Sequence, residues 1–241
     1  MCRYGGHFEL ARKYNLYVIE DTAQAIGASY TFSNGKVKMA GCMGNLGCTS
    51  FFPSKNLGFF GDGGAMYTDD DILAQKIRMI ANHGQTIQYH HDFIGVNSRL
   101  DTLQAAILRA KLPQLDGYNV KRNYAAEYYD DMFRAVPGLK TPIRAANTNH
   151  VFHQYTLQVE GSISRDSLRN YLSQIGIPSM IYYPVPLHKQ KAYIDERYPE
   201  GYFPIAEDLC TRVLSLPMHT ELSVEQLGYI SNHVLSFINN Q

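Results

Sequence analysis

SFFPSKNLG (residues 50–58), followed by Gly61-Asp62-Gly63-Gly64, places a single lysine, Lys55, in an aromatic and glycine-rich segment. An ammonium group loses hydration when it leaves water, so burial lowers the pKa of a lysine. A lowered pKa suits an amine that forms a Schiff base with a carbonyl compound. On its own, such a segment more often holds a surface-loop lysine. The rest of the sequence has to decide between the two interpretations.

Composition excludes several classes of protein. The chain has 241 residues, of which 45% are hydrophobic and 18% charged, as in a globular protein with a sizeable core. Lys+Arg and Asp+Glu both number 22, and this balance argues against a nucleic-acid or membrane-surface partner. The four cysteines show no CxxC spacing, and no apolar run is long enough for a membrane span. We therefore predict a cytoplasmic protein without disulfides.

The first half of the chain alternates between predicted strands and helices. An apolar strand at residues 16–19 leads to Asp21, at the end of the strand where open α/β sheets place ligand-binding groups. Two further short strands are predicted at residues 49–52 and 65–68. A helix capped by the acidic run 69–71 follows, and it ends at Asn82-His83-Gly84. This alternation predicts an α/β protein.

The second half predicts a long helical stretch and a smaller α/β part. The expected elements are helix over 100–133 with a break at Pro113, strand near 151–159, helix over 164–175, a proline-stiffened loop at 182–188 and helix over 223–238. We predict a partial large domain at residues 1–115. Residues 116–241 then form a long linking helix and a small C-terminal domain.

Asp21 and Lys55 form a candidate pair. If the strands that precede them are neighbours, the carboxylate and the amine face one crevice. Pyridoxal phosphate needs such a pair, because the lysine binds it covalently and a carboxylate keeps its pyridine nitrogen protonated. Ser50 and the neighbouring glycines offer donors for the phosphate. The competing interpretation is that Asp21 is only the N-cap of a helix over residues 22–25.

Four blocks occur in a specific order along the chain. They are EDTAQAIGA (20–28), SFFPSK with GDGG (50–55 and 61–64), NHGQ (82–85) and GVNSRLDTLQAA (95–106). Together they resemble the sugar aminotransferases of the DegT/DnrJ/EryC1/StrS family over nearly the whole chain. The resemblance implies a fold-type-I pyridoxal-phosphate-dependent transferase, represented here by the C-terminal part of the large mixed-sheet domain and a small α/β domain.

The resemblance also implies roles for individual residues. Lys55 is then the Schiff-base lysine and the proton shuttle, and Asp21 pairs with the pyridinium nitrogen. Gln24 lies against the cofactor ring or its hydroxyl, and Ser50 binds the phosphate. Asn97 resembles the family asparagine that reaches the phosphate from the partner subunit. The expected assembly is a homodimer with shared active sites.

Finer similarity indicates a substrate class. The segments at 89–91, 96–104 and 183–190 most resemble enzymes that aminate the 3-keto form of a UDP-N-acetylglucosaminuronate. Enzymes acting at C4 more often carry Tyr-Arg-Met after that asparagine. Arg99 is then the candidate for gripping the sugar carboxylate, because a guanidinium fork matches that group. It competes with the interpretation that Arg99 caps the next helix or pairs with Asp101.

Two residues of the proline-rich loop complete the expected sugar pocket. Tyr183 and His188 would line it from the small domain, although His188 is also compatible with a loop histidine without a role. No metal site is expected. His90 and His91 are adjacent and cannot share one helix face, and the pair His150 and His153 has no accompanying carboxylate.

The chain departs from the family in its length. Family members carry a further segment, about a third of the full chain, before the equivalent of residue 16. Without it the sheet is expected to have open edges and exposed apolar faces. The resemblance implies an aminotransferase that uses L-glutamate to aminate a nucleotide-linked keto-sugar for surface polysaccharide or glycan synthesis. The alternatives are a truncated, non-catalytic remnant and a sugar aminotransferase that acts at C4. Lys55 favours an aminotransferase over the dehydratases of the family, which have histidine at that position.

Overall fold

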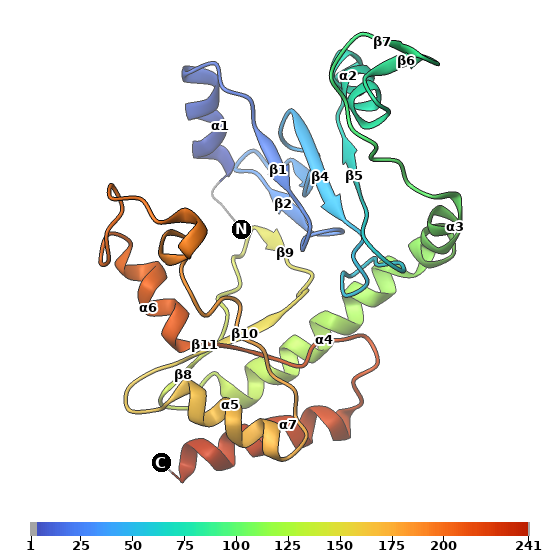
Figure 1. The fold of residues 1–241 in the computed structure, drawn as a ribbon. Helices are drawn as coiled ribbons and strands as arrows, with labels where there is room; N and C mark the ends of the chain where they lie inside the picture. The colour runs from blue at the N-terminus through green and yellow to red at the C-terminus, as the bar shows by residue number, and fades with distance from the viewer. Residues whose placement is uncertain (1–3, 241) are drawn as a thin grey trace. The chain divides into compact units, whose positions relative to one another are not determined.

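The computed structural model describes residues 4–240 and divides the chain into two compact units (Figure 1). One unit consists of Met1–Val120 and Arg144–His153, and the other of Lys121–Ile143 and Gln154–Gln241. The division therefore falls inside helix α4 (Leu115–Phe133), a few residues beyond the predicted boundary at 115/116. The segment 144–153 returns to the first unit, although the sequence predicted it in the second part.

A mixed three-stranded sheet forms the centre of the first unit. Its order is β1 (Ile19–Asp21), β4 (Leu46–Ser50) and β5 (Gly64–Tyr67), with β1 parallel and β5 antiparallel to β4. The first strand begins three residues later than predicted. The reason is that the N–H of Val18 is bonded to the side-chain oxygen of Asn45 rather than to a neighbouring strand, at 2.8 Å.

A second small sheet explains why residues 144–153 belong to this unit. It has the order β3 (Val37–Met39), β2 (Ser29–Thr31) and β9 (Thr148–Asn149). Sequence periodicity missed these strands because two or three residues are too few to show alternation. Helix α1 (Tyr4–Lys13) lies against the same region through an edge-on contact of Tyr4 with Tyr30 and a tilted contact of Phe8 with Phe32. The shared core consists of Ala28, Tyr30, Ala40, Met43 and Val151.

The rest of the first unit is helical, with one hairpin. Helix α2 (Asp71–Ala81) starts as predicted, because the Asp70 carboxylate accepts the N–H groups of two residues in its first turn. Strands β6 (Gln85–Ile87) and β7 (His90–His91) follow as a hairpin that projects beyond α2 (Figure 1). Helix α3 (Thr102–Lys111) then leads through the 3-10 turn η1 (Leu112–Gln114), which contains Pro113, into α4.

The second unit is a small antiparallel sheet with helices. The strand order is β11 (Val213–Leu216), β10 (Tyr155–Val159) and β8 (Leu139–Lys140). Its helical elements are α5 (Arg165–Gln174), η2 (Leu187–Lys189), η3 (Lys191–Tyr193), α6 (Pro204–Arg212) and α7 (Val224–Asn239). Its core is apolar, and the fully buried side chains include Tyr129, Phe133, Tyr155, Leu157, Leu168, Leu172, Leu214 and Leu227.

The central sheet of the first unit has two unpaired edges. Within residues 4–240, β1 and β5 each have a neighbouring strand on one side only. Ile19 on β1 and Met66 on β5 are 65% and 49% exposed, and Tyr17 just before β1 is 77% exposed. Large apolar side chains therefore face outward where strands are unpaired.

In the described part of the chain no helix is both long and apolar enough to cross a lipid bilayer.

Candidate active site

The site is built at the carboxyl ends of two parallel strands. In the β1–β4 register Asp21 lies opposite Cys48, so Asp21 and Ser50 finish their strands at the same end of the sheet. Gly64 pairs with Ser50 on the other side, and its missing side chain is required because a Cβ would lie 2.3 Å from the Thr49 carbonyl oxygen. The chain continues from Ser50 directly into the turn that carries Lys55.

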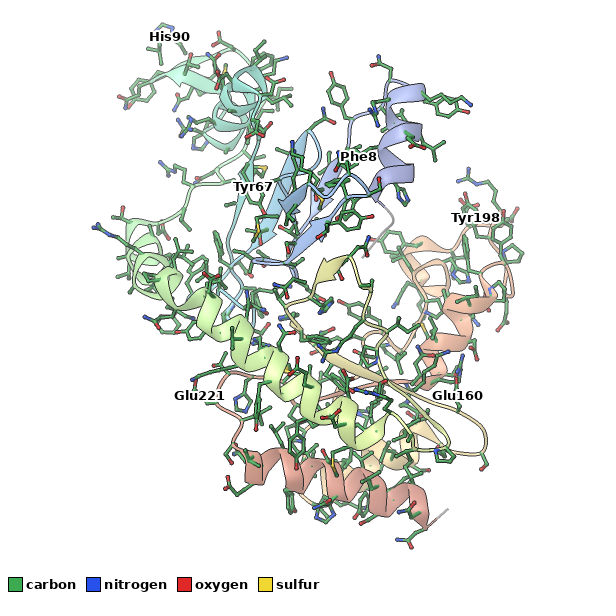
Figure 2. All side chains as sticks on the ribbon, turned by 180° about the vertical axis from the view of Figure 1, so that it is seen from behind. Phe8, Tyr67, His90, Glu160, Tyr198 and Glu221 are labelled. Atoms are coloured by element: carbon green, nitrogen blue, oxygen red, sulfur yellow. The ribbon has the colours of Figure 1, made fainter. Side chains whose placement is uncertain are left out.

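The segment after Asp21 forms turns rather than a helix. The Asp21 carboxylate accepts the N–H of Ala23 at 2.9 Å, which closes a local turn, so the helix N-cap interpretation is wrong. Thr22 is 1% exposed, and its hydroxyl lies within hydrogen-bond distance of the Cys48 carbonyl (2.8 Å) and the Tyr67 hydroxyl (2.6 Å). Tyr67 belongs to β5 and is labelled in Figure 2. These contacts hold the residue next to Asp21 in one orientation.

The charge at this strand end affects its neighbours. Burial raises the pKa of the Cys48 thiol, and the nearby Asp21 carboxylate raises it further. Burial also raises the pKa of Tyr67, although its hydrogen bond to Thr22 opposes the shift. Both groups therefore remain protonated at neutral pH, and Asp21 contributes the negative charge at this edge.

Lys55 lies in a compact, half-buried turn. Its N–H donates to the Phe52 carbonyl at 2.9 Å, and the Ser50 hydroxyl accepts the Phe52 N–H at 3.2 Å. Gly58 closes the turn, because a Cβ there would lie 2.6 Å from the carbonyl oxygen of Phe52. Within residues 4–240 the Lys55 amine has no hydrogen-bond or ion-pair partner. A fixed backbone therefore presents a free amine.

These groups fit pyridoxal phosphate. Asp21 could supply a carboxylate for the pyridine nitrogen, and Ser50, which pairs with the closely packed Gly64, could supply a hydroxyl for the phosphate. Lys55 supplies an amine that no carboxylate of the described chain engages. Gln24, in the turn after Asp21, is exposed at the same end of β1. The arrangement matches the donor set that this cofactor requires.

Asn97 and Arg99 lie in the strand-like segment that follows the β6–β7 hairpin. Asn97 is bridged to Asn82 through the backbone, and Arg99 Nε donates to Asn97 Oδ1 at 3.0 Å. Both side chains are exposed. In the described residues the two Nη groups of Arg99 have no partner, and Asp101 caps helix α3 without a side-chain hydrogen bond.

Arg99 also borders a hollow of the first unit. This hollow of about 740 Å³ opens between β5 and α2, and Asp21 and Lys55 are not part of its lining. The first unit thus presents Arg99 on a concave surface and Lys55 on a separate turn.

The two predicted residues of the second unit differ in their surroundings. Tyr183 is 66% exposed in the loop before η2. The His188 side chain is only 8% exposed, and its Nε2 lies 3.0 Å from Glu207 Oε1. Glu207 also accepts the N–H groups of Gly201 and Phe203, and these contacts lower its pKa, the Gly201 bond most strongly. Within residues 4–240, His188 Nδ1 has no hydrogen-bond partner.

Sequence reasoning missed three polar residues that are buried beside the site. Glu20, Asn56 and Asn119 are 4%, 6% and 8% exposed. Glu20 directly precedes Asp21 inside the first block, and Asn56 directly follows Lys55, so their positions beside predicted site residues were a usable signal. Asn119 lies in a helix outside every block, and nothing in its local sequence marks it.

The histidines considered for metal binding have other contacts. His150 Nδ1 accepts the N–H of Phe152, and His91 Nδ1 lies 2.8 Å from the His83 carbonyl. His90 lies at the end of the projecting hairpin (Figure 2). Across residues 4–240, no three His, Cys, Asp or Glu side chains are grouped so that they could hold a metal ion.

Comparison with known proteins identifies the family. A sequence model of the DegT/DnrJ/EryC1/StrS aminotransferase family matches residues 7–235. The protein therefore belongs to the DegT/DnrJ/EryC1/StrS aminotransferase family, and the fold-class prediction is confirmed. Members of this family are aminotransferases that use pyridoxal phosphate.

Individual relatives differ in their substrates. A UDP-N-acetyl-3-dehydro-α-D-glucosamine 3-aminotransferase from Acidithiobacillus ferrooxidans is 47% identical over 94% of this chain and 58% of its own length. A UDP-2-acetamido-2-deoxy-3-oxo-D-glucuronate aminotransferase from Pseudomonas aeruginosa is 44% identical, over 92% and 58%. The crystal structure of DesV from S. venezuelae, solved with a ketimine intermediate, superposes with a TM-score of 0.92 at 39% identity, over 99% and 62%. The chain thus spans about three fifths of the length of these relatives.

Proposed function

We propose that the protein acts as an aminotransferase on a nucleotide-linked keto-sugar, with pyridoxal phosphate as cofactor and L-glutamate as amino donor. The observation that supports this most directly is the common strand end that carries Asp21, Ser50 and the Lys55 turn. Bound there, the cofactor would supply an electron sink for amino transfer. The product would be an amino-sugar for polysaccharide or glycan synthesis in the cytoplasm.

Each candidate residue has a defined role in this proposal. Lys55 binds the cofactor covalently through Nζ and moves a proton during the exchange of the amino group. The Asp21 carboxylate keeps a proton on the pyridine nitrogen, and the Ser50 hydroxyl donates a hydrogen bond to the phosphate. Gln24 lies against the cofactor ring. Tyr183 and His188 contact the sugar.

We propose that the working form is a homodimer in which Asn97 reaches the cofactor phosphate of the partner subunit. The hairpin segment that carries it is unusually apolar for a surface. Ile94 is 99% exposed, Tyr89 is 81% exposed and Ile87 is 67% exposed. Exposed apolar side chains on one projecting segment are typical of a surface that binds another protein chain.

The proposed substrate is the UDP-linked 3-keto-N-acetylglucosaminuronate. Of two relatives that act on 3-keto sugars, one is named for a glucuronate, which carries a carboxylate, and the other for a glucosamine, which does not. The unpaired Nη groups of Arg99 fit a carboxylate. Held by Asn97 through Nε, the guanidinium keeps its outer edge available for a bidentate contact.

The first test is the visible absorption spectrum of the 241-residue chain with pyridoxal phosphate. We expect a lysine-dependent band that disappears on addition of L-glutamate and is absent in Lys55→Ala. A folded wild-type chain without the band would reject activity in this chain. Lys36→Ala, at an exposed position in the same unit, is the matched control and keeps the band.

The second test separates the candidate sugars. Arg99→Gln should reduce kcat/KM for the 3-keto uronate by about tenfold or more, because a charge-assisted bidentate contact is lost. The same change should leave the 3-keto N-acetylglucosamine nucleotide nearly unaffected. Arg109→Gln, an exposed arginine on α3, is the control and changes neither value. Equal losses for both sugars would reject the carboxylate contact.

A further inference from the structure

One side chain of α4 connects the two segments of the candidate site. Asn119 Oδ1 accepts a hydrogen bond from Asn56 Nδ2 at 2.8 Å, and Asn119 Nδ2 donates to the Ile26 carbonyl at 3.2 Å. Asn56 directly follows Lys55, and Ile26 belongs to the turns that begin after Asp21. A single amide thereby bridges the turn with the amine and the turn with the carboxylate.

We propose that Asn119 is a positioning residue, which fixes the Lys55 turn relative to the segment that carries Asp21 and Gln24. Its effect on cofactor binding rests on the proposed function. The hydrogen bonds themselves belong to the first unit and do not depend on it. Asn119 acts through Asn56 and Ile26.

Burial makes this arrangement specific. Asn56 and Asn119 are both nearly inaccessible, so their amide groups must find partners within the protein. Asn56 Nδ2 also donates to the Val151 carbonyl at 3.0 Å, and Asn56 Oδ1 lies 3.2 Å from His153 Nδ1. With both ends of the Asn56 amide engaged, the side chain cannot be flipped without losing contacts. Because the Asn119 amide accepts a hydrogen bond from this fixed Asn56 side chain, its own orientation is fixed as well.

The chain approaches Asn119 so closely that a glycine is needed. Gly27 has a φ of +85°, and a Cβ at this position would lie 2.3 Å from Asn119 Nδ2. The next residue, Ala28, is buried in the core of the small second sheet. Ile26 and Gly27 therefore pass directly over the amide, and the contact is built into the turn.

An isosteric change separates the two hydrogen bonds. Asn119→Asp keeps an oxygen that accepts from Asn56 Nδ2, but it removes the donor to Ile26 and turns a carboxylate oxygen toward a carbonyl. Two controls isolate other effects. Asn34→Asp adds the same charge on an exposed turn and still accepts the Lys36 N–H. Thr68→Val removes a hydroxyl hydrogen bond to the Asn45 carbonyl (2.6 Å), just beyond the end of β5 that is farther from Ser50.

The experiment combines amide hydrogen exchange of the cofactor-free chain with a pyridoxal phosphate titration. In Asn119→Asp we expect faster exchange at Ala25 and Ala28, whose N–H groups close the turns, and at Lys55. We also expect a dissociation constant for the cofactor at least about fivefold higher, with an altered band of the lysine-bound form. Asn34→Asp should match wild type. Thr68→Val should lose stability but keep cofactor affinity and spectrum.

The outcomes distinguish the two proposals. If Asn119→Asp lowers stability but matches Thr68→Val in exchange at Lys55, affinity and spectrum, Asn119 has only a packing role and the inference is overturned. If wild type shows no lysine-dependent band, the proposed function fails for this chain. Exchange at Ala25, Ala28 and Lys55 then still decides whether Asn119 couples the two turns.

Discussion

Glu20 Oε1 accepts the backbone N–H of Met43 at 2.6 Å, across the loop that leads into β4. The same carboxylate accepts the N–H groups of Gly44 at 2.6 Å and Gly41 at 2.9 Å, so three backbone donors converge on one buried acid. Glu20 directly precedes Asp21, and the loop it binds sets where β4 begins. The carboxylate thus fastens the two strands whose ends carry the site.

Glu20→Gln should destabilise the protein by about 2–3 kcal/mol, because a single amide oxygen cannot replace two acceptor oxygens and leaves a buried N–H without a partner. Urea unfolding measures the change. Glu9→Gln, at an exposed position on α1, serves as the control and should stay within about 0.5 kcal/mol of wild type. A similar result for both variants would contradict the role of the three hydrogen bonds.

Asp21→Asn should make the Cys48 thiol more reactive. The Asp21 charge contributes to the raised pKa of Cys48, and the asparagine oxygen still accepts the Ala23 N–H. Removing the charge lowers the thiol pKa, although burial keeps it above its ordinary value. Iodoacetamide labelling at pH 8, followed by peptide mass spectrometry, gives the rate for Cys48 relative to the exposed Cys42 in the same sample. An unchanged ratio would show that the carboxylate does not act on the thiol.

Gly84→Ala should be more harmful than Gly35→Ala, although both glycines have φ near +80°. A Cβ at Gly35 meets nothing within 4 Å, so only backbone strain of about 1–2 kcal/mol applies. A Cβ at Gly84 would collide with the Phe93 carbonyl, and we expect a total of about 2–5 kcal/mol. Denaturant unfolding gives the energies, and proteolysis of the 85–97 segment reports its loosening. Equal losses of stability in Gly84→Ala and Gly35→Ala would mean that the segment around Phe93 moves away from the added Cβ without cost.

Glu207→Gln should make the stability of the protein less dependent on pH in the acid range. Hydrogen bonds from Gly201 and the contact with His188 hold the pKa of Glu207 below its ordinary 4.5. A carboxyl with a lowered folded-state pKa stabilises the protein fully above the unfolded value, and this contribution is lost as pH falls through the folded value. The midpoint of thermal unfolding, measured between pH 3 and 7, should therefore fall less steeply below pH 4.5 in the variant than in wild type. The exposed Glu196→Gln is the control, and a parallel decline in wild type and Glu207→Gln would contradict the assignment.

Several parts of the fold followed from local sequence. The Asp70 carboxylate, the apolar spacing behind it and the glycine at position 84 determine α2, because capping and periodicity act within one or two turns. Pro113 marks the break before α4 for a similar reason. The ordered blocks around Asp21, Lys55 and Asn97 were sufficient to indicate the family, since each block is continuous in the chain.

Other features depend on residues that are distant in the sequence. β9 joins the first unit only because residues 148–149 pair with β2, which lies more than a hundred residues earlier. Two residues carry no periodic signal, so only the paired backbone reveals this strand. His188 was predicted from its position in the proline-rich loop, but only the tertiary structure shows that its Nε2 lies 3.0 Å from Glu207 Oε1, which is 19 residues away.

The sequence by itself determined which groups could do the chemistry: one lysine, one aspartate and a short hydroxyl, each in a continuous block that implies a cofactor. The tertiary structure decided what holds them in place. Glu20 and Asn119 gain their roles from hydrogen bonds to residues that lie 21–24 and 63–93 positions away. Such bonds form because buried carboxylates and amides must find partners, and which partners are within reach depends on how the chain is folded.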